Sequence, residues 1–538
     1  MVIPRPDNGI LKRVYSNLVN AKDFVGIEFP DRILRRLYTY GSLENVEDGV
    51  KFEVKNRLRD AKLTDVDYVE IDDERYDRVR LSFSDEQLYS DVISEDNPID
   101  FPVGRTVTAY VEREPLDYGD HDIRIKFKTN PFGKLDLQVT DSLSEEEEEL
   151  TGVPRMEGDD NFSEEAIKER QDFLEEISNT ELEHVPQYSI DPAETEGNIE
   201  NFVGAAQIPL GIAGPLKING EHAQGEFPIP LATTEGTLVA SYNRGMKAIN
   251  MSGGAECTVV QDRMNRAPAF VFDSAREARE FRDWVFKNYD NVREAAEETS
   301  SVAELESIEP YMMSRFLYLR FNFRTGDAAG QNMVGKATFA GCNWLLENFP
   351  GYVENFYLEG NMATDKKASQ INSLRTRGKT VTAESVIDRK VVVRHLGAEP
   401  ESLAHHGDVG TMGAYMAGAN SNGAHAANGI AAMFVACGQD EANVAESSAS
   451  FVHTEVTESD DLYVSITIPS LIVATYGGGT NLPTQRECLK MLNCHGTGNV
   501  KKFAEVVAGV CLAGELSLAS AISASDWVTS HEALGRNR

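Results

Sequence analysis

The stretch VVAGVCLAGELSLASAISA, Val506 to Ala524, is the most apolar long segment of a chain of 538 residues. It is rich in small side chains, and Glu515 interrupts it. A membrane span needs about 20 predominantly apolar residues with few or no charges, so this stretch fits a span poorly. It predicts a buried helix of a globular domain.

The first quarter of the chain has a different texture, in which apolar and charged residues alternate. DIRIKFK places Ile123, Ile125 and Phe127 on one face of a strand, and KLDLQV does the same from Leu135 to Val139. Turn residues such as NPFGK separate these runs. We expect an all-β, sandwich-like accessory domain over 1–142, with a structural role in packing or oligomerisation.

A chain of this length is too long for one ordinary core, which predicts two or three domains. The acidic run Glu145 to Glu149 cannot pack against itself and predicts a solvated linker over 143–170. From 171 to 538 the sequence is rich in Gly and Ala and alternates helical and strand-like segments. The four charged stretches that are candidates for catalysis all lie in this region.

The net charge argues against two classes of binding partner, and the cysteines indicate a cellular compartment. A formal net charge of −35 argues against nucleic acid and anionic membranes, because phosphate-bearing surfaces attract the opposite sign. The opening MVIPRPDNGILKR lacks the apolar core of a signal peptide. The cysteines show neither paired nor metal-type spacing, which is typical of free thiols in the cytoplasm. They are Cys257, Cys342, Cys437, Cys488, Cys494 and Cys511.

The stretch LATTEGTLVASYNRGMKA places Glu235 at an expected strand-to-helix turn. Ser241, Arg244 and Lys247 follow three residues apart, on one face of the expected helix. Such a helix suits a phosphate-bearing ligand. A capped helix with a basic solvent-facing side explains the same pattern equally well.

Three further stretches carry charged groups in unusual places. NMATDKKASQIN puts Asp365 directly before Lys366 and Lys367, although such a pair is usually an unremarkable surface feature. Asp440 ends an apolar run, where a carboxylate is either a cap or a placed catalytic group. His531 lies close to the chain end, where a lone histidine normally has no role.

Two glycine-bearing loops, Arg324 to Val334 and Tyr476 to Gln485, allow the backbone to approach a ligand closely. Neither has the spacing G-x-G-x-x-G after a strand. A Rossmann-type cofactor site is therefore not supported.

Together these stretches resemble the hydroxymethylglutaryl-CoA reductase family, of the class I type. The resemblance begins near NIENFVGAAQIPLGIAGPLKING, Asn198 to Gly220, and continues to the C-terminus. Its landmarks occur in the family's order: TTEG, TGDAAGQNMV, TDKK, GAHAANGIAAMFVACGQD, YGGGTNLPTQ and a final SH. The implied fold is α+β, with a large domain around a long central helix and an inserted ferredoxin-like small domain, here 267–357.

The resemblance implies four catalytic residues, Glu235, Lys366, Asp440 and His531. Reducing a thioester to an alcohol takes two hydrides, and each raises negative charge on the substrate oxygen. A lysine ammonium stabilises that charge, and a protonated glutamic acid supplies a proton if burial keeps its pKa near neutral. Asp440 is expected to bond to both groups, and His531 to protonate the departing CoA thiolate.

The resemblance also implies the ligand contacts. A nicotinamide nucleotide, NADPH or NADH, is expected to meet Asp327, Gly330, Asn332, Met333 and Arg536. No metal is expected. The site should form between subunits of a homodimer or higher oligomer. The expected contacts to the acyl-CoA substrate are Ser241, Arg244, Lys247, Asn361, Asp365, Lys367, His425 and Asn428.

Some positions depart from the family's pattern. Glu359, Val271 and Val409 stand where a serine, an arginine and a lysine usually hold the free carboxylate of the substrate. Glu359 is expected to repel that carboxylate by several kcal/mol in a dry site. An arginine that would pair with the 2′-phosphate of NADPH is absent near Ser300 and Ser301.

These departures leave two alternatives beside a reductase that makes mevalonate for isoprenoid synthesis. One is a divergent paralogue that reduces another acyl-CoA. The other is a non-catalytic scaffold on the same fold, which the complete set of Glu235, Lys366, Asp440 and His531 disfavours.

Overall fold

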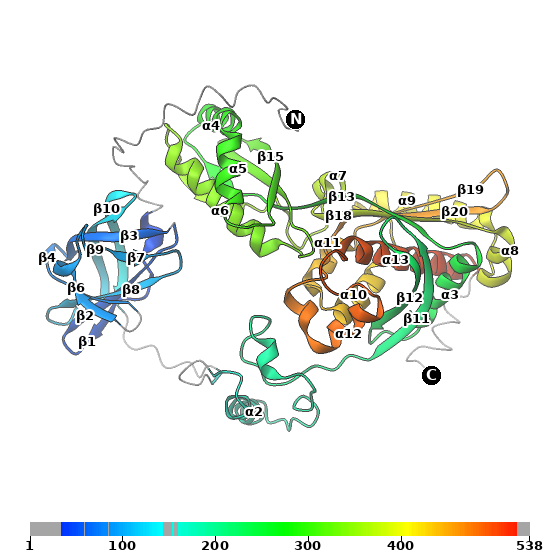
Figure 1. The fold of residues 1–538 in the computed structure, drawn as a ribbon, viewed down its shortest axis with the longest axis horizontal. Helices are drawn as coiled ribbons and strands as arrows, with labels where there is room; N and C mark the ends of the chain where they lie inside the picture. Colours follow the sequence, from blue (N-terminus) through cyan, green and yellow to red (C-terminus); the bar gives the residue numbers. More distant parts are fainter. Residues whose placement is uncertain (1–33, 59, 84–85, 144–152, 155–159, 525–538) are drawn as a thin grey trace.

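The computed structural model describes residues 34–58, 60–83, 86–143, 153–154 and 160–524 (Figure 1). Among these residues, the buried apolar side chains form three separate clusters. One cluster fills the N-terminal β region, one fills residues around 264–356, and the largest surrounds the long C-terminal helix. The expected α+β fold with an N-terminal all-β region is confirmed.

The N-terminal region is a sandwich of two antiparallel sheets, with strand orders β1-β2-β8-β5-β6 and β10-β9-β3-β4, where β7 also pairs with β3. Its inward positions follow the alternation in the sequence: Ile123, Ile125 and Phe127 on β9 are all buried. The elements are η2 Arg35–Leu37, β1 Glu44–Val46, β2 Gly49–Lys55, β3 Ala61–Ile71, β4 Glu74–Tyr76, β5 Arg80–Phe83, β6 Glu86–Tyr89, η3 Ser90–Val92, β7 Ile99–Phe101, β8 Thr106–Glu112, β9 Gly119–Asn130 and β10 Gly133–Leu143.

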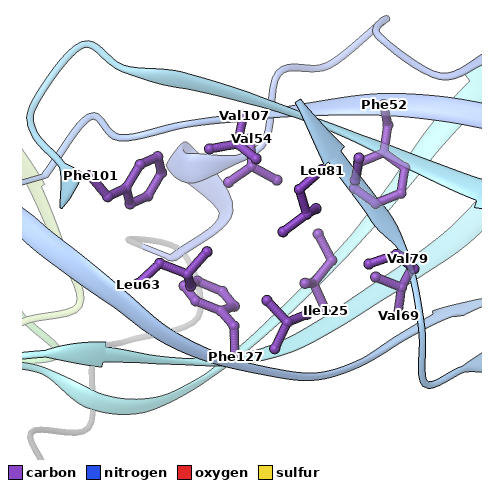
Figure 2. A pocket seen from close by; sticks show the side chains of 12 residues that line it. Phe52, Val54, Leu63, Val69, Val79, Leu81, Phe101, Val107, Ile125 and Phe127 are labelled. Carbon is purple, nitrogen blue, oxygen red and sulfur yellow. The ribbon is translucent and has the colours of Figure 1, made fainter. Parts of the chain in front are cut away.

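A small cavity of about 40 Å³ remains between the two sheets of this sandwich. Figure 2 shows Phe52 and Leu81 from one sheet facing Ile125 and Phe127 from the other. The lining is entirely apolar, and the volume is little more than the share of one water molecule in the liquid. The cavity is therefore a packing gap and not a ligand site.

His121 on β9 joins two loops of the sandwich. Its Nδ1 lies 2.6 Å from Oδ2 of Asp72, and its Nε2 lies 2.7 Å from the carbonyl oxygen of Asp117. Both partners are acceptors, so both ring nitrogens donate only in the imidazolium form. Burial alone lowers the pKa of His121, but the bonds to Asp72 and Asp117 outweigh burial and raise it above its ordinary value.

This raised pKa predicts a pH-dependent stability of the sandwich. The contribution of His121 is fully present below the unfolded pKa of about 6.5 and is lost as pH rises through the folded pKa. We expect His121→Gln to lower the local stability by about 1 kcal/mol at pH 5.5, and by less at pH 8.5. Amide exchange of β9, corrected for its intrinsic pH dependence, measures both values; an equal loss at the two pH values would contradict the assignment.

The second cluster is the core of a ferredoxin-like unit with the element order βαββαβ, if α4 and α5 count as one connection. Its sheet has the strand order β17-β14-β16-β15, and every pairing in it is antiparallel. Ser274 and Glu277 form a capping box at the start of α4. The elements are β14 Ala269–Val271, α4 Ala275–Lys287, α5 Tyr289–Glu297, β15 Glu304–Met313, β16 Phe316–Arg324, α6 Gln331–Asn348 and β17 Asn355–Tyr357.

The strand β13, Glu256–Arg266, connects this small unit to the large one. Its first part, Glu256 to Arg263, pairs with β18, and its end, Met264 to Arg266, pairs with β16. The other elements of this region are α2 Glu164–Ser178, η4 Pro192–Thr195, β11 Leu210–Asn219, β12 Gln224–Ala232, α3 Leu238–Met251, α7 Gln370–Arg375, β18 Gly378–Ile387, α8 Arg389–Val391, η5 Val392–Leu396, α9 Pro400–Ala417, α10 Ala426–Cys437, η6 Glu441–Asn443, α11 Val444–Ser447, β19 Phe451–Val456, β20 Leu462–Leu471, η7 Gly478–Asn481, α12 Pro483–Met491 and α13 Val500–Ser523.

The long helix α13 lies at the centre of the large unit (Figure 1) and contacts α3, α10, β18 and β20. By length and composition it is the one described helix that could cross a membrane, yet 78% of its most apolar window is buried inside the protein. The predicted buried core helix is confirmed. Glu515 is tolerated within it because its carboxylate accepts the N–H groups of Ala424, His425 and Ala426 at the start of α10.

The β sandwich docks on the small unit. Arg36 donates to Oδ1 of Asn355 over 2.9 Å, and its guanidinium lies 5.5 Å from the ring centre of Tyr357. Nδ2 of Asn343 on α6 donates to the carbonyl oxygen of Leu58 over 2.7 Å. The accessory region therefore touches β17, the strand that leads into the TDKK loop.

Candidate functional site

The TDKK loop connects β17 to α7 in a strained conformation. Asn361, Thr364 and Lys366 all have positive φ angles, between 57° and 65°. Residues other than glycine rarely adopt this region, and they do so where the surrounding structure enforces it. The loop is therefore held by contacts elsewhere in the protein.

Lys366 and Asp440 are in direct contact. Nζ of Lys366 lies 3.2 Å from Oδ2 of Asp440, with 45% and 35% of the two side chains exposed. Asp440 follows α10 and the positive-φ Gly438, and its Oδ1 caps η6 by accepting the N–H of Ala442. The structure thus brings together two of the four predicted catalytic residues.

Behind this pair lies a buried ionic network that the sequence did not reveal. Arg377 is fully buried; its Nη1 donates to Oε1 of Glu446 over 2.5 Å, and its Nη2 lies 2.9 Å from Oδ1 of Asp365. Oε1 of Glu446 also accepts the backbone N–H of Lys366 over 3.0 Å. Burial raises the pKa of Glu446 to about 7, against the opposing effect of Arg377.

Glu235 lies on the exposed turn between β12 and α3. Its N–H donates to Oγ1 of Thr233 over 3.0 Å. Among the described residues, its carboxyl group makes neither a hydrogen bond nor an ion pair with Lys366 or Asp440. The expected contact of Asp440 with both groups therefore holds within one chain for Lys366 alone.

The predicted CoA contacts on α3 and α10 form one cluster. Oγ of Ser241 lies 3.2 Å from Nε2 of His425, and Nδ2 of Asn428 lies 2.9 Å from Nδ1 of the same ring. Arg244 donates from Nε to Oγ of Ser517 over 3.1 Å and from Nη2 to the Ser517 carbonyl oxygen over 2.5 Å. Lys247 is exposed on the same helix. Ser517 was not predicted, because nothing in the α13 sequence marks it.

A cavity of about 730 Å³ opens beside Asp440. Gly330, Asn332 and Met333, at the start of α6, line it together with Gly477 to Gly479. The N–H groups of a helix N-terminus attract a phosphate, and glycines without side chains let the ligand approach the backbone. A Cβ on Gly477 or Gly478 would meet nothing within 4 Å, so the backbone here is open. These features fit part of a dinucleotide.

Asp327, the remaining predicted residue of the cofactor loop, uses its carboxylate for contacts with the start of α13. Its two carboxylate oxygens accept the N–H groups of Gly498 and Val500 over 2.8 and 3.1 Å. It therefore caps the start of α13 and ties the cofactor loop to the central helix. His531 and Arg536 lie outside the described residues.

The remaining loop residues clarify the expected substrate repulsion. Glu359 is not an isolated charge: its Oε2 lies 3.1 Å from Nη1 of Arg266, and its Oε1 accepts the N–H of Asn361 over 2.6 Å. Nη1 of Arg266 also lies 3.5 Å from Oδ2 of Asp365. Lys367 donates from Nζ to the Asp365 carbonyl oxygen over 3.0 Å. Glu359 thus shares Arg266 with Asp365, and the expected repulsion of the substrate carboxylate stays a prediction.

The other two departures have ordinary structural settings. Val271 is buried on β14, and Val409 is exposed on α9.

Of the described residues, Glu221, His222 and Glu505 could offer ligand atoms within 4.8 Å of one another. One carboxylate oxygen of Glu505 already accepts the N–H groups of His222 and Ala223. The expected absence of a metal stays a prediction.

Two family models match the chain. The family model described as hydroxymethylglutaryl-coenzyme A reductase matches residues 166–536, and the model for the N-terminal domain of hydroxymethylglutaryl-CoA reductase matches residues 33–144. The chain belongs to the hydroxymethylglutaryl-CoA reductase family. The predicted resemblance is confirmed.

Individual relatives of the family agree. The chain is 46% identical to the 3-hydroxy-3-methylglutaryl-coenzyme A reductase of Pyrococcus horikoshii over 69% of this chain and 92% of the relative. It is 42% identical to that of Haloferax volcanii over 69% and 93%. The solved class II reductase of Streptococcus pneumoniae, bound to NADPH, superposes with a TM-score of 0.51 at 20% identity, covering 68% of this chain and 99% of that chain. This last likeness shows the fold.

Proposed function

We propose that the chain reduces 3-hydroxy-3-methylglutaryl-CoA to mevalonate and free CoA at the expense of a nicotinamide nucleotide. The observation that carries the proposal is the contact of Lys366 with Asp440 at a cavity that the start of α6 also lines. The relatives at 42–46% identity are named for this substrate, which disfavours another acyl group. A non-catalytic scaffold would not need the exposed ammonium of Lys366 beside the carboxylate of Asp440.

Lys366 supports the reaction by electrostatic stabilisation. Each reduction step places negative charge on the substrate oxygen, first as the thioester becomes a thiohemiacetal and then as the aldehyde becomes an alcohol. A fixed ammonium at that oxygen stabilises the charge as it develops. Asp440, at 3.2 Å, holds the ammonium in place by an ion pair.

Protons come from two other groups. We assign Glu235 as the acid that protonates the alkoxide formed in the second step, and His531 as the acid for the CoA thiolate released when the thiohemiacetal collapses. The bound nicotinamide supplies the hydrides. Gly330, Asn332 and Met333 would hold its nucleotide part against the start of α6. The nucleotide is NADPH or NADH; the absence of the arginine expected near Ser300 favours NADH, unless other groups bind the 2′-phosphate.

We propose that the working form is at least a homodimer. Glu235 is exposed in the single chain, although an acid that stays protonated near neutral pH needs a desolvated setting. The second half of α9 presents an apolar surface to solvent: Val409, Met412, Tyr415 and Met416 are 56, 60, 78 and 83% exposed. Contiguous exposed apolar surface marks a protein interface. A second copy would cover it and bring its own Glu235 to the Lys366–Asp440 pair.

The cytoplasm is the proposed location, supported by six free, buried cysteines. The function is tested by following nicotinamide oxidation and CoA thiol release together, with each nucleotide at several salt concentrations. The proposal predicts two nucleotides oxidised per thiol released with hydroxymethylglutaryl-CoA. A much better substrate in a panel of other acyl-CoA thioesters would overturn the assignment.

A further inference from the structure

Glu446 meets the main chain of Lys366 from inside the protein. It lies on α11, is buried, and accepts the backbone N–H of Lys366 on Oε1 over 3.0 Å. Lys366 at this point has a φ of +57°, a conformation that a lysine rarely adopts on its own. The hydrogen bond therefore joins this unusual peptide unit to a buried side chain.

The chain segment from Asp440 to Glu446 also contacts the ammonium of Lys366. Asp440 begins the segment at the cap of η6 and contacts Nζ of Lys366, and Glu446 lies six residues later on α11. Residues 440–446 thus contact Lys366 both at its backbone N–H and at its ammonium. Of these two carboxylates, Asp440 lines the cavity and Glu446 does not.

A buried arginine connects Glu446 to the loop that carries Lys366. Nη1 of Arg377 donates to Oε1 of Glu446, and its Nη2 forms an ion pair with Oδ1 of Asp365 at 2.9 Å, so Arg377 links the segment to the residue just before Lys366. Asn372 adds a second link: its Nδ2 donates to Oγ1 of Thr364 over 2.6 Å and lies 3.5 Å from Oε2 of Glu446. Glu446 contacts Arg377, Asn372 and the backbone N–H of Lys366, so its side chain links these groups.

We propose that Glu446, held by Arg377, is a positioning residue that fixes the backbone of Lys366 so that its ammonium meets the substrate oxygen. The inference rests on the proposed role of Lys366. It assigns Glu446 no contact with substrate, because its carboxylate faces Arg377, Asn372 and the Lys366 amide in the interior. A displacement of about 1 Å at a reacting group can lower the rate 100-fold, so a buried positioning group can have a large effect.

The test compares Glu446→Gln and the double variant Glu446→Leu/Arg377→Met with the full-length wild type. Gln keeps an oxygen for the Lys366 amide and removes the charge. The double variant removes the amide acceptor and replaces the buried pair by apolar side chains, which is often neutral or stabilising for folding. Glu505→Gln is the matched control, since Glu505 is a buried glutamate that accepts the backbone N–H groups of His222 and Ala223.

We expect the double variant to lower kcat by about 10- to 100-fold while KM changes by less than about threefold. Glu446→Gln should retain more activity than the double variant. Amide exchange in peptides spanning 361–370, measured without nucleotide, should accelerate in the double variant and stay unchanged in Glu505→Gln. Wild-type kcat and wild-type exchange in a folded double variant would overturn the inference.

Failure of the positioning role and failure of the proposed function give different results. If Lys366→Ala keeps full turnover, the catalytic role of the lysine itself is wrong. If Lys366→Ala is inactive and the double variant matches the wild type in kcat and in exchange, only the role of Glu446 is wrong. Should the double variant not fold, equal kcat and equal exchange in Glu446→Gln and Glu446→Ala would overturn the inference, because only Gln keeps the acceptor.

Discussion

Lys366→Ala is expected to lower kcat for hydroxymethylglutaryl-CoA reduction by about 10²- to 10³-fold, the usual effect of removing one group that stabilises a developing oxyanion. The reason is that the Nζ of Lys366, 3.2 Å from Asp440, is the ammonium that the described residues place at this carboxylate. Removing it also leaves Asp440 without its counter-charge. Steady-state nicotinamide oxidation at saturating substrate measures the loss.

Stability should change little in this variant, because the Lys366 side chain is 45% exposed. Lys390→Ala on α8, an exposed lysine with no assigned role, is the control and should match the wild type. Full turnover in folded Lys366→Ala would contradict the mechanism. A partial recovery in Lys366→Arg would support a role of the charge, since arginine keeps the charge and changes its geometry.

Glu235→Gln is expected to lower kcat by about 10²- to 10⁴-fold, the range for loss of a general acid. The effect would be unusual for a side chain that is exposed in the single chain, because surface substitutions are normally neutral. Glu226→Gln, an exposed glutamate on the preceding strand β12, is the matched control. Thermal unfolding and the oligomeric state should be those of the wild type. Wild-type kcat in Glu235→Gln would remove this residue from the mechanism.

Much of the fold follows from local patterns. The period-2 alternation of Ile123, Ile125 and Phe127 predicted β9, and the apolar run with small residues predicted α13. Both signals work because burial of one strand face, or of a whole helix, imposes its period on the sequence. The ferredoxin-like unit was predicted from the family resemblance, because its three-residue strands β14 and β17 carry almost no pattern of their own.

The long-range contacts of the candidate site could not be predicted from the sequence. The contact of Lys366 with Asp440 was expected from the family resemblance of two motifs. Arg377 and Glu446 lie 69 residues apart and meet only in the folded chain. The compensation of Glu359 by Arg266 likewise joins positions 93 residues apart. A single sequence carries no signal for such long-range pairs, because each partner alone looks like an ordinary charged residue.

We propose that one chain supplies Lys366 and Asp440, and that the partner subunit supplies Glu235. Coexpression of Glu235→Ala and Lys366→Ala chains tests it most directly. With random pairing, about half of the dimers are mixed and each mixed dimer holds one intact site, so the account predicts about a quarter of wild-type activity. A mixture of Lys366→Ala and Asp440→Ala chains should stay inactive, because both changes fall on the same side of each site. Inactivity of the first mixture, with mixed dimers present, would contradict the shared site.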